Sequence, residues 1–287
     1  MERFLRLMHI LLVRKLAVRA RQVVGETSVS HNHTMVLYLL SREFVALGPD
    51  LVPYFLREIL VGSGRRTRGY AEFLQHVGDM RGVARFAGNA FMSSVLQRCR
   101  RLRMDEVTEL LASPRPLMRI YHSGDVESRT PDQDYIPLGV RKSLARRPNP
   151  HTIEKLSMEQ DPQVVRNLLS NPRITEEIVI KMASLRPTGQ EVLSEIFNNH
   201  RWSARYRVRK ALVFNPYTLP RVAHALLPML MLSDLMDISM GRTLHHSVRN
   251  AAKRFIMLRI SDMGPTEKEQ FSKSNAARLK SIFLETG

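Results

Sequence analysis

The stretches VRKSLARRP (Val140–Pro148), VVRNLLSNP (Val164–Pro172) and VRKALVFNP (Val208–Pro216) can be laid over one another. Each begins with valine, carries leucine at its fifth position and ends in proline at its ninth. Self-similarity of this kind is typical of repeat proteins, in which each short unit buries its apolar face only against its neighbours. The repeats therefore predict an extended stack of helical units that presents a long surface.

Each unit is expected to be a pair of short antiparallel helices. Proline disfavours helical geometry in the residue before it, so Pro172 and Pro216 each end a helix. A threonine stands shortly after the proline of each unit and can cap the next helix: Thr152, Thr175 and Thr218.

The spacing of the copies is irregular. Val140 and Val164 lie 24 positions apart, whereas Val208 follows Val164 by 44 positions. The stretch VLSEIFNNH (Val192–His200) between them fits the pattern loosely, and a last partial copy begins at Val248. We therefore expect a degenerate unit in the middle of the stack.

These repeats resemble the HEAT-like families of bacterial helical repeats, particularly the leucine-rich repeat variant type with its VRxxLAxNPxTP rhythm. Asp161-Pro162 followed by Val165-Arg166 also resembles the HEAT arrangement, in which an aspartate opens the second helix. The resemblance covers about 137–260, and the chain departs from the family pattern in its middle unit and in 218–240. It implies scaffold-type binding without enzymatic activity.

The fold class expected for the whole chain is all-α, because no stretch alternates apolar and polar residues in the manner of a strand. We predict an N-terminal helical domain (1–121), a linker (122–136), HEAT-like repeats forming a short α-solenoid (137–262) and a C-terminal capping helix with a tail (263–287). The linker is polar and rich in turn-forming residues. Before it, helices are predicted at 2–24, 32–47, 50–61, 70–78, 82–101 and 105–112.

The N-terminus carries an apolar run, Leu7–Val13, between Arg6 and Arg14. A bilayer takes ~20 apolar residues to span, so this run is too short. The arginines around it and the absence of acids from Arg3 to Gly25 resemble a transit peptide or a membrane-surface helix. The apolar residues go nearly all the way round the helix, however, so we expect a buried first helix and a cytoplasmic protein without integral membrane segments.

The formal net charge is +17, from 44 Lys and Arg against 27 Asp and Glu. The excess is spread along the chain, so no basic tail explains it. A surplus of this size favours an anionic partner.

The densest basic run lies at 201–210, where Trp202 and Tyr206 are interleaved with arginines, and further cations follow in the partial repeat at 248. On a helix, aromatic residues on the arginine side could stack on exposed bases while the arginines grip phosphates. In the alternative interpretation the two aromatic residues are core and the repeat arginines pair with acids. The predicted binding surface is Arg201, Trp202, Arg205, Tyr206, Arg209, Lys210, Arg249 and Lys253.

The function expected from this pattern is a non-enzymatic scaffold or adaptor whose basic repeat surface binds an acidic protein. A nucleic-acid-binding protein that grips the phosphate backbone is the first alternative, and a HEAT-like DNA-repair enzyme is the second. No cofactor or metal is expected, because His31-x-His33 has no further ligand at zinc-site spacing. The single cysteine, Cys99, is expected to be structural.

Overall fold

The computed structural model describes residues 2–28, 30, 32–112, 116–118 and 136–284, and its regular secondary structure in these residues is entirely helical. The all-α prediction is confirmed. The predicted linker lies outside the described residues except for Ile136. Within the described part of the chain, no helix combines the length and apolarity that a membrane span requires.

Glycines at positive φ set the boundaries of the helices before the predicted linker. The predicted helices 32–47 and 50–61 are one helix kinked at Gly48, where φ is 73°. The predicted helix 82–101 is broken in two at Gly88, where φ is 91°. Only glycine adopts such angles without strain, so both breaks are encoded locally. The helices of this part are α1 (Glu2–Ser28), α2 (His33–Gly64), α3 (Tyr70–Gly78), α4 (Met80–Ala87), α5 (Asn89–Arg101) and α6 (Asp105–Leu111).

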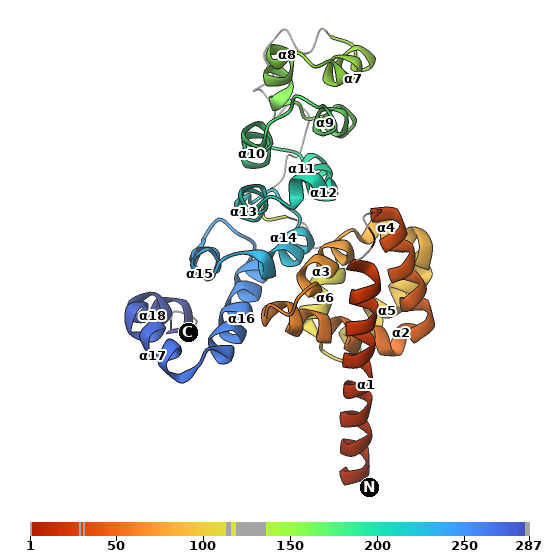
Figure 1. Cartoon of the computed structure of the whole chain (residues 1–287), viewed down its shortest axis with the longest axis vertical. Coiled ribbons are helices and arrows are strands. Elements are labelled where there is room, and N and C mark those ends of the chain that lie inside the picture. The colour runs from red at the N-terminus through yellow and green to blue at the C-terminus, as the bar shows by residue number, and fades with distance from the viewer. Residues whose placement is uncertain (1, 29, 31, 113–115, 119–135, 285–287) are drawn as a thin grey trace.

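In the C-terminal half of α1, one side of the helix is buried. Leu16, Ala20 and Val23 are buried there, whereas Val18 is 64% exposed. The first turns of the helix extend away from the other helices (Figure 1). The expectation of a first helix buried all round is therefore wrong, because no other helix lies beside its N-terminal half.

The remaining helices begin at residue 138. They are α7 (Leu138–Arg146), α8 (Pro150–Lys155), α9 (Pro162–Leu169), α10 (Glu176–Ser184), α11 (Gln190–Asn198), α12 (His200–Ser203), α13 (Tyr206–Phe214), α14 (Pro220–Leu226), α15 (Leu232–Met240), α16 (His246–Asp262), α17 (Pro265–Ser274) and α18 (Ala276–Leu284). A 3₁₀ turn, η2 (Leu156–Met158), follows α8, and another, η3 (Leu227–Met229), follows α14.

Helices α7 to α13 form two stacked rows (Figure 1). Helices α7, α9 and α11 pack in succession in one row, and η2, α10 and α13 pack in succession in the other. The first two copies of the sequence repeat, on α7 and α9, thus lie in one row, while the third copy, on α13, lies in the opposite row. From α9 the chain crosses to α10, returns to α11 and crosses again to α13. These three crossings leave α13 in the row opposite α9.

A buried asparagine joins consecutive helices of each row. Asn171, after α9, donates its Nδ2 hydrogens to the carbonyls of Ala145 (2.8 Å) and Arg147 (2.9 Å) at the end of α7. Asn215, after α13, does the same to Ala183 (2.8 Å) and Leu185 (3.0 Å) at the end of α10. The carbonyls at a helix C-terminus have no partner within the helix, so each asparagine satisfies two of them.

The two halves of the described chain share one apolar core. Helix α14 packs against α3 and α6, and α16 packs against α2. Polar contacts cross the same junction: Gln75 donates to the Ser203 hydroxyl, and Arg254 pairs with Glu109 at 2.7 Å. The C-terminal pair α17 and α18 reaches α15, with Ile282 of α18 buried.

We predict that Asn171→Ala and Asn215→Ala each lower the free energy of unfolding by about 2–3 kcal/mol, because each change leaves a buried carbonyl, that of Ala145 or Ala183, without its side-chain donor and removes a second, part-buried hydrogen bond. Chemical denaturation followed by circular dichroism measures this. Asn149 is the control, because it is exposed and only caps α8, through the N–H groups of His151 and Thr152. Asn149→Ala should cost about 1 kcal/mol. Equal losses of stability in all three variants would contradict the role assigned to Asn171 and Asn215.

His224 on α14 supplies a pH-dependent contribution to stability. It is 3% exposed, and burial first, then the charges of Arg254 and His245, lower its pKa to about 3. Its ring lies near the Ser247 hydroxyl (3.3 Å) and the Glu109 carboxylate (3.8 Å). The ring is therefore neutral in the folded chain at neutral pH.

Because the unfolded chain takes up a proton at His224 near pH 6.5 and the folded chain only near pH 3, stability is full above about pH 6.5 and falls as the pH decreases between these values. His224→Gln should reduce that slope by up to about 1.4 kcal/mol per pH unit, as measured by denaturation between about pH 7 and 5. His151→Gln, at an exposed position on α8, is the control. An unchanged slope in His224→Gln would refute this assignment.

Candidate functional site

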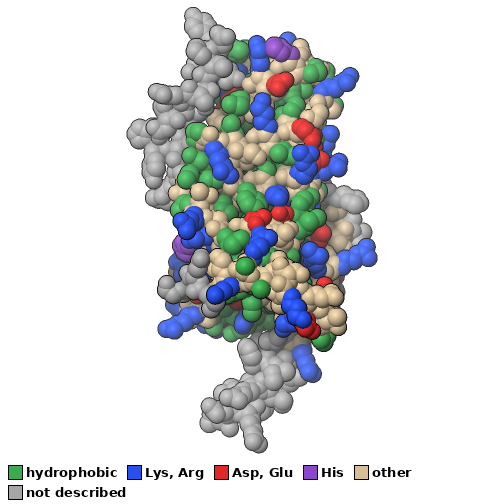
Figure 2. Space-filling model, turned by 90° about the vertical axis from the view of Figure 1, so that its left-hand side faces the viewer, with side chains coloured by type: hydrophobic (Ala, Val, Ile, Leu, Met, Phe, Trp, Pro, Cys, Tyr) green, Lys and Arg blue, Asp and Glu red, His purple; other side chains and the backbone are tan. Residues whose placement is uncertain are grey.

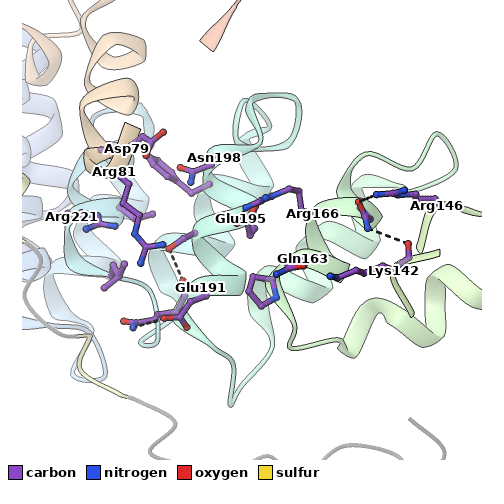
Figure 3. Close-up of a pocket in the computed structure, with 18 residues that line it drawn as sticks. Asp79, Arg81, Lys142, Arg146, Gln163, Arg166, Glu191, Glu195, Asn198 and Arg221 are labelled. Carbon is purple, nitrogen blue, oxygen red and sulfur yellow. Dashed lines mark hydrogen bonds and ion pairs between the residues drawn. The ribbon is translucent and has the colours of Figure 1, made fainter. Parts of the chain in front are cut away.

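A polar groove of about 560 Å³ lies where the α7–α9–α11 row meets the N-terminal helices. Its walls come from α4, α7, α9, α11 and α14, and Arg81 on α4 and Arg221 on α14 lie 140 positions apart along the chain. We call it the basic groove, after the cations that line it (Figure 3): Arg81, Lys142, Arg146, Arg166 and Arg221.

The cations differ in how they are neutralised. Arg166 forms a two-pronged pair with Glu195, at 2.8 and 2.6 Å. Arg146 donates to the side-chain oxygen of Asn167 at 3.3 Å. Among the described residues, no carboxylate lies within ion-pair distance of Arg81, Lys142 or Arg146. These three side chains therefore leave positive charge available to a ligand.

Two guanidinium groups lie close together at the α4–α14 end of the groove. Burial first, and then the nearby charge of Arg81, lower the pKa of Arg221, while the charge of Asp79 opposes the shift. Like charges held near each other in a partly buried site attract an anion. Glu191 and Glu195 also line the groove, between this end and the Lys142–Arg146 end (Figure 3).

The residues predicted from the basic run take other positions. Trp202 is 4% exposed and donates from its indole nitrogen to the carbonyl of Leu169 at 2.8 Å. Tyr206 donates to Asp234 and accepts from the N–H of Met231. Stacking of Trp202 on an exposed base is therefore wrong, because the ring fills the interior between α9 and α12.

The cations of the same run mostly serve local contacts. Arg209 donates to the carbonyls of Ser203 and Ala204, which follow α11. Lys210 pairs with Asp234 at 2.8 Å. Arg201 lies over the Trp202 ring at 4.6 Å from its centroid, while Arg205 is exposed.

The two predicted cations of the last partial repeat lie on α16. Arg249 is half-buried, and Lys253 lines a different, largely apolar cavity between α2 and α16. All eight predicted residues are described, and the basic groove includes none of them.

On the face formed by α8, α10, α13 and α15, basic side chains are scattered among apolar ones and do not gather (Figure 2).

The repeat arginines follow the alternative interpretation in part. Arg141 pairs with the buried Glu159 at 2.6 Å, and Arg166 pairs with Glu195. Asp161 caps α9 through the N–H groups of Gln163 and Val164. The groove was missed because the sequence does not show which repeat positions face α4.

A cluster of three histidines borders the groove. His33 begins α2, His76 is in the last turn of α3, and His200 begins α12. His33 Nδ1 lies 3.0 Å from His76 Nδ1 and 2.7 Å from His200 Nε2. Within the described residues these are the only three His, Cys, Asp or Glu side chains with ligand atoms grouped as a metal ion requires, all within 4.8 Å of one another.

Asp79 holds the cluster in place and also lines the groove. Its Oδ2 lies 3.0 Å from His33 Nε2, and its Oδ1 accepts from the N–H of Gly82 at 3.0 Å, which caps α4. Burial by itself would raise the pKa of Asp79, but the hydrogen bonds from His33 and Gly82 and the charges of His33 and Arg221 outweigh it and lower the pKa. The carboxylate is therefore ionised and fixes the orientation of His33.

The other two rings of the cluster are neutral at pH 7. Burial, followed by the charges of His200 and His33, lowers the pKa of His76 to about 3. Burial, followed by the charge of His33, lowers the pKa of His200 to about 4, with Asp79 opposing. In the sequence, His33 stands out only through its neighbour His31, which lies outside the described residues, and no local spacing links it to His76 or His200.

No protein-family model, curated protein or solved structure matches this chain.

Proposed function

We propose that this chain is a non-enzymatic HEAT-like helical-repeat scaffold that binds an acidic segment of a partner protein in the basic groove. The observation that carries the proposal is the set of cations Arg81 on α4 and Lys142 and Arg146 on α7, which have no carboxylate partner among the described residues. Helices α7 to α13 would then be a short solenoid whose α7–α9–α11 row presents the ligand-binding face.

The groove favours a protein segment over nucleic acid. Glu191 and Glu195 lie among the cations along its wall. A phosphate backbone carries a negative charge at every step and would meet both acids, whereas a peptide can place carboxylates at the cations and polar groups at the acids. The buried Trp202 also removes the aromatic platform that single-stranded nucleic acid would use.

The test is fluorescence anisotropy with a labelled decaglutamate peptide and with single- and double-stranded DNA of similar length. We expect the peptide to bind the full chain at about 50 mM salt, with an affinity that weakens at about 200 mM because exposed charges are screened. Lys142→Glu combined with Arg146→Glu should weaken peptide binding by at least about tenfold, which corresponds to about 1.4 kcal/mol.

Arg173→Glu combined with Lys268→Glu is the matched control. It makes the same change in net charge at two exposed positions outside the groove. Equal weakening by both double variants would show that net charge alone attracts the peptide, and the groove would be rejected. Tighter binding of either DNA than of the peptide would replace the protein partner by nucleic acid.

A further inference from the structure

The histidine cluster has the arrangement of a ligand set for a metal ion. His33 Nδ1 lies 3.0 Å from His76 Nδ1 and 2.7 Å from His200 Nε2, and one ligand atom from each of the three rings lies within 4.8 Å of the other two. In a tetrahedral zinc site with zinc–nitrogen bonds of about 2.05 Å, ligand nitrogens lie about 3.3 Å from one another. The contacts of 3.0 and 2.7 Å are a few tenths of an ångström shorter, so small movements of the rings would admit an ion.

Hydrogen bonds among the three rings can use only part of this arrangement. When the Nε2 hydrogen of His33 is directed at Asp79, Nδ1 of the neutral ring carries a single lone pair. Nitrogens of both His76 and His200 approach that lone pair, and it can accept well from only one of them. An ion at the centre would accept one lone pair from each of the three rings.

The contact of Asp79 with His33 is the second observation that points to a metal. Histidines that bind metals usually donate their other ring hydrogen to a carboxylate, which fixes the tautomer and makes the ligating nitrogen more basic. Asp79 does this, and it is itself held by the backbone N–H of Gly82 at the start of α4. Packing of the three rings alone would not require that a hydrogen-bonded carboxylate hold His33 in this orientation.

We propose that His33, His76 and His200 bind one late first-row divalent metal ion, with zinc as the ion best suited, and that Asp79 is a positioning residue for His33. Three neutral imidazoles suit zinc, cobalt, nickel and copper, and do not suit magnesium or calcium, which prefer oxygen ligands. The fourth coordination position would hold water or an added ligand such as imidazole, because the three rings are only half-buried.

The ion would fasten the two halves of the chain together. His33 and His76 belong to α2 and α3, whereas His200 belongs to α12, 167 positions after His33. Because the three ligands are far apart along the chain, the unfolded chain has no such site, and binding to the folded form alone raises stability. The site is independent of the basic groove in its ligands and touches it only through Asp79.

The first test is cobalt(II) titration of the full-length chain after removal of metals with a chelator. We expect one ion per chain, the visible absorption bands of four-coordinate cobalt, displacement by one equivalent of zinc, and a higher melting temperature with zinc than without it. His76→Ala and His200→Ala should each abolish the cobalt bands. Asp79→Asn should keep the bands but weaken cobalt binding by about 10- to 100-fold, as loss of a supporting carboxylate does.

His246→Ala is the matched control, because His246 is exposed on α16 and stacks on His245 away from the cluster. It should leave stoichiometry, spectrum and affinity unchanged. Melting curves without metal establish that each variant folds, and His200→Gln replaces any alanine variant that does not. Absence of four-coordinate bands in the wild-type chain, or their persistence in both His76→Ala and His200→Ala, would overturn the proposal.

Discussion

Helices of four to nine residues are too short to be stable alone, so α7 to α15 depend on burying their apolar faces against one another. Each such helix also ends in carbonyls that need donors. The side chains of Asn171 and Asn215 supply them from the next helix of the same row, and both are almost fully buried. These hydrogen bonds fix the distance and the angle between consecutive helices of a row. The shape of the stack therefore depends on them.

The shape of the stack determines what lies at its junction with the N-terminal helices. Helix α14 packs against α3 and α6, and this contact brings α4 beside the α7–α9–α11 row. The basic groove and the histidine cluster both form there, with Asp79 bordering each of them. A small rotation of the stack relative to α3 would therefore alter both sites together, by changing the distance from Arg81 to Arg146 and from His76 to His200.

The net charge of the chain did not indicate where unpaired cations lie in the structure. The net charge of +17 and its even distribution were readable from composition, and they favour an anionic partner. The densest run of cations, 201–210, nevertheless serves mainly internal contacts: Arg209 caps backbone carbonyls and Lys210 pairs with Asp234. Trp202, chosen as a surface aromatic, fills the core. Local density of charge could not separate these roles, because burial is decided by which face of α12 and α13 meets α9 and α10.

The sequence by itself determined the all-α class, the repeats and most helix boundaries, because these depend on local chemistry: glycine at positive φ in Gly48 and Gly88, proline after the repeat helices, and helix caps such as Asp161 and Thr175. Only the tertiary structure decided that the third copy changes rows, that five cations from four helices share one groove, and that His33, His76 and His200 meet. These features arise between residues separated by tens to more than a hundred positions. No local pattern records such contacts, because they follow from the packing angles that accumulate along the stack.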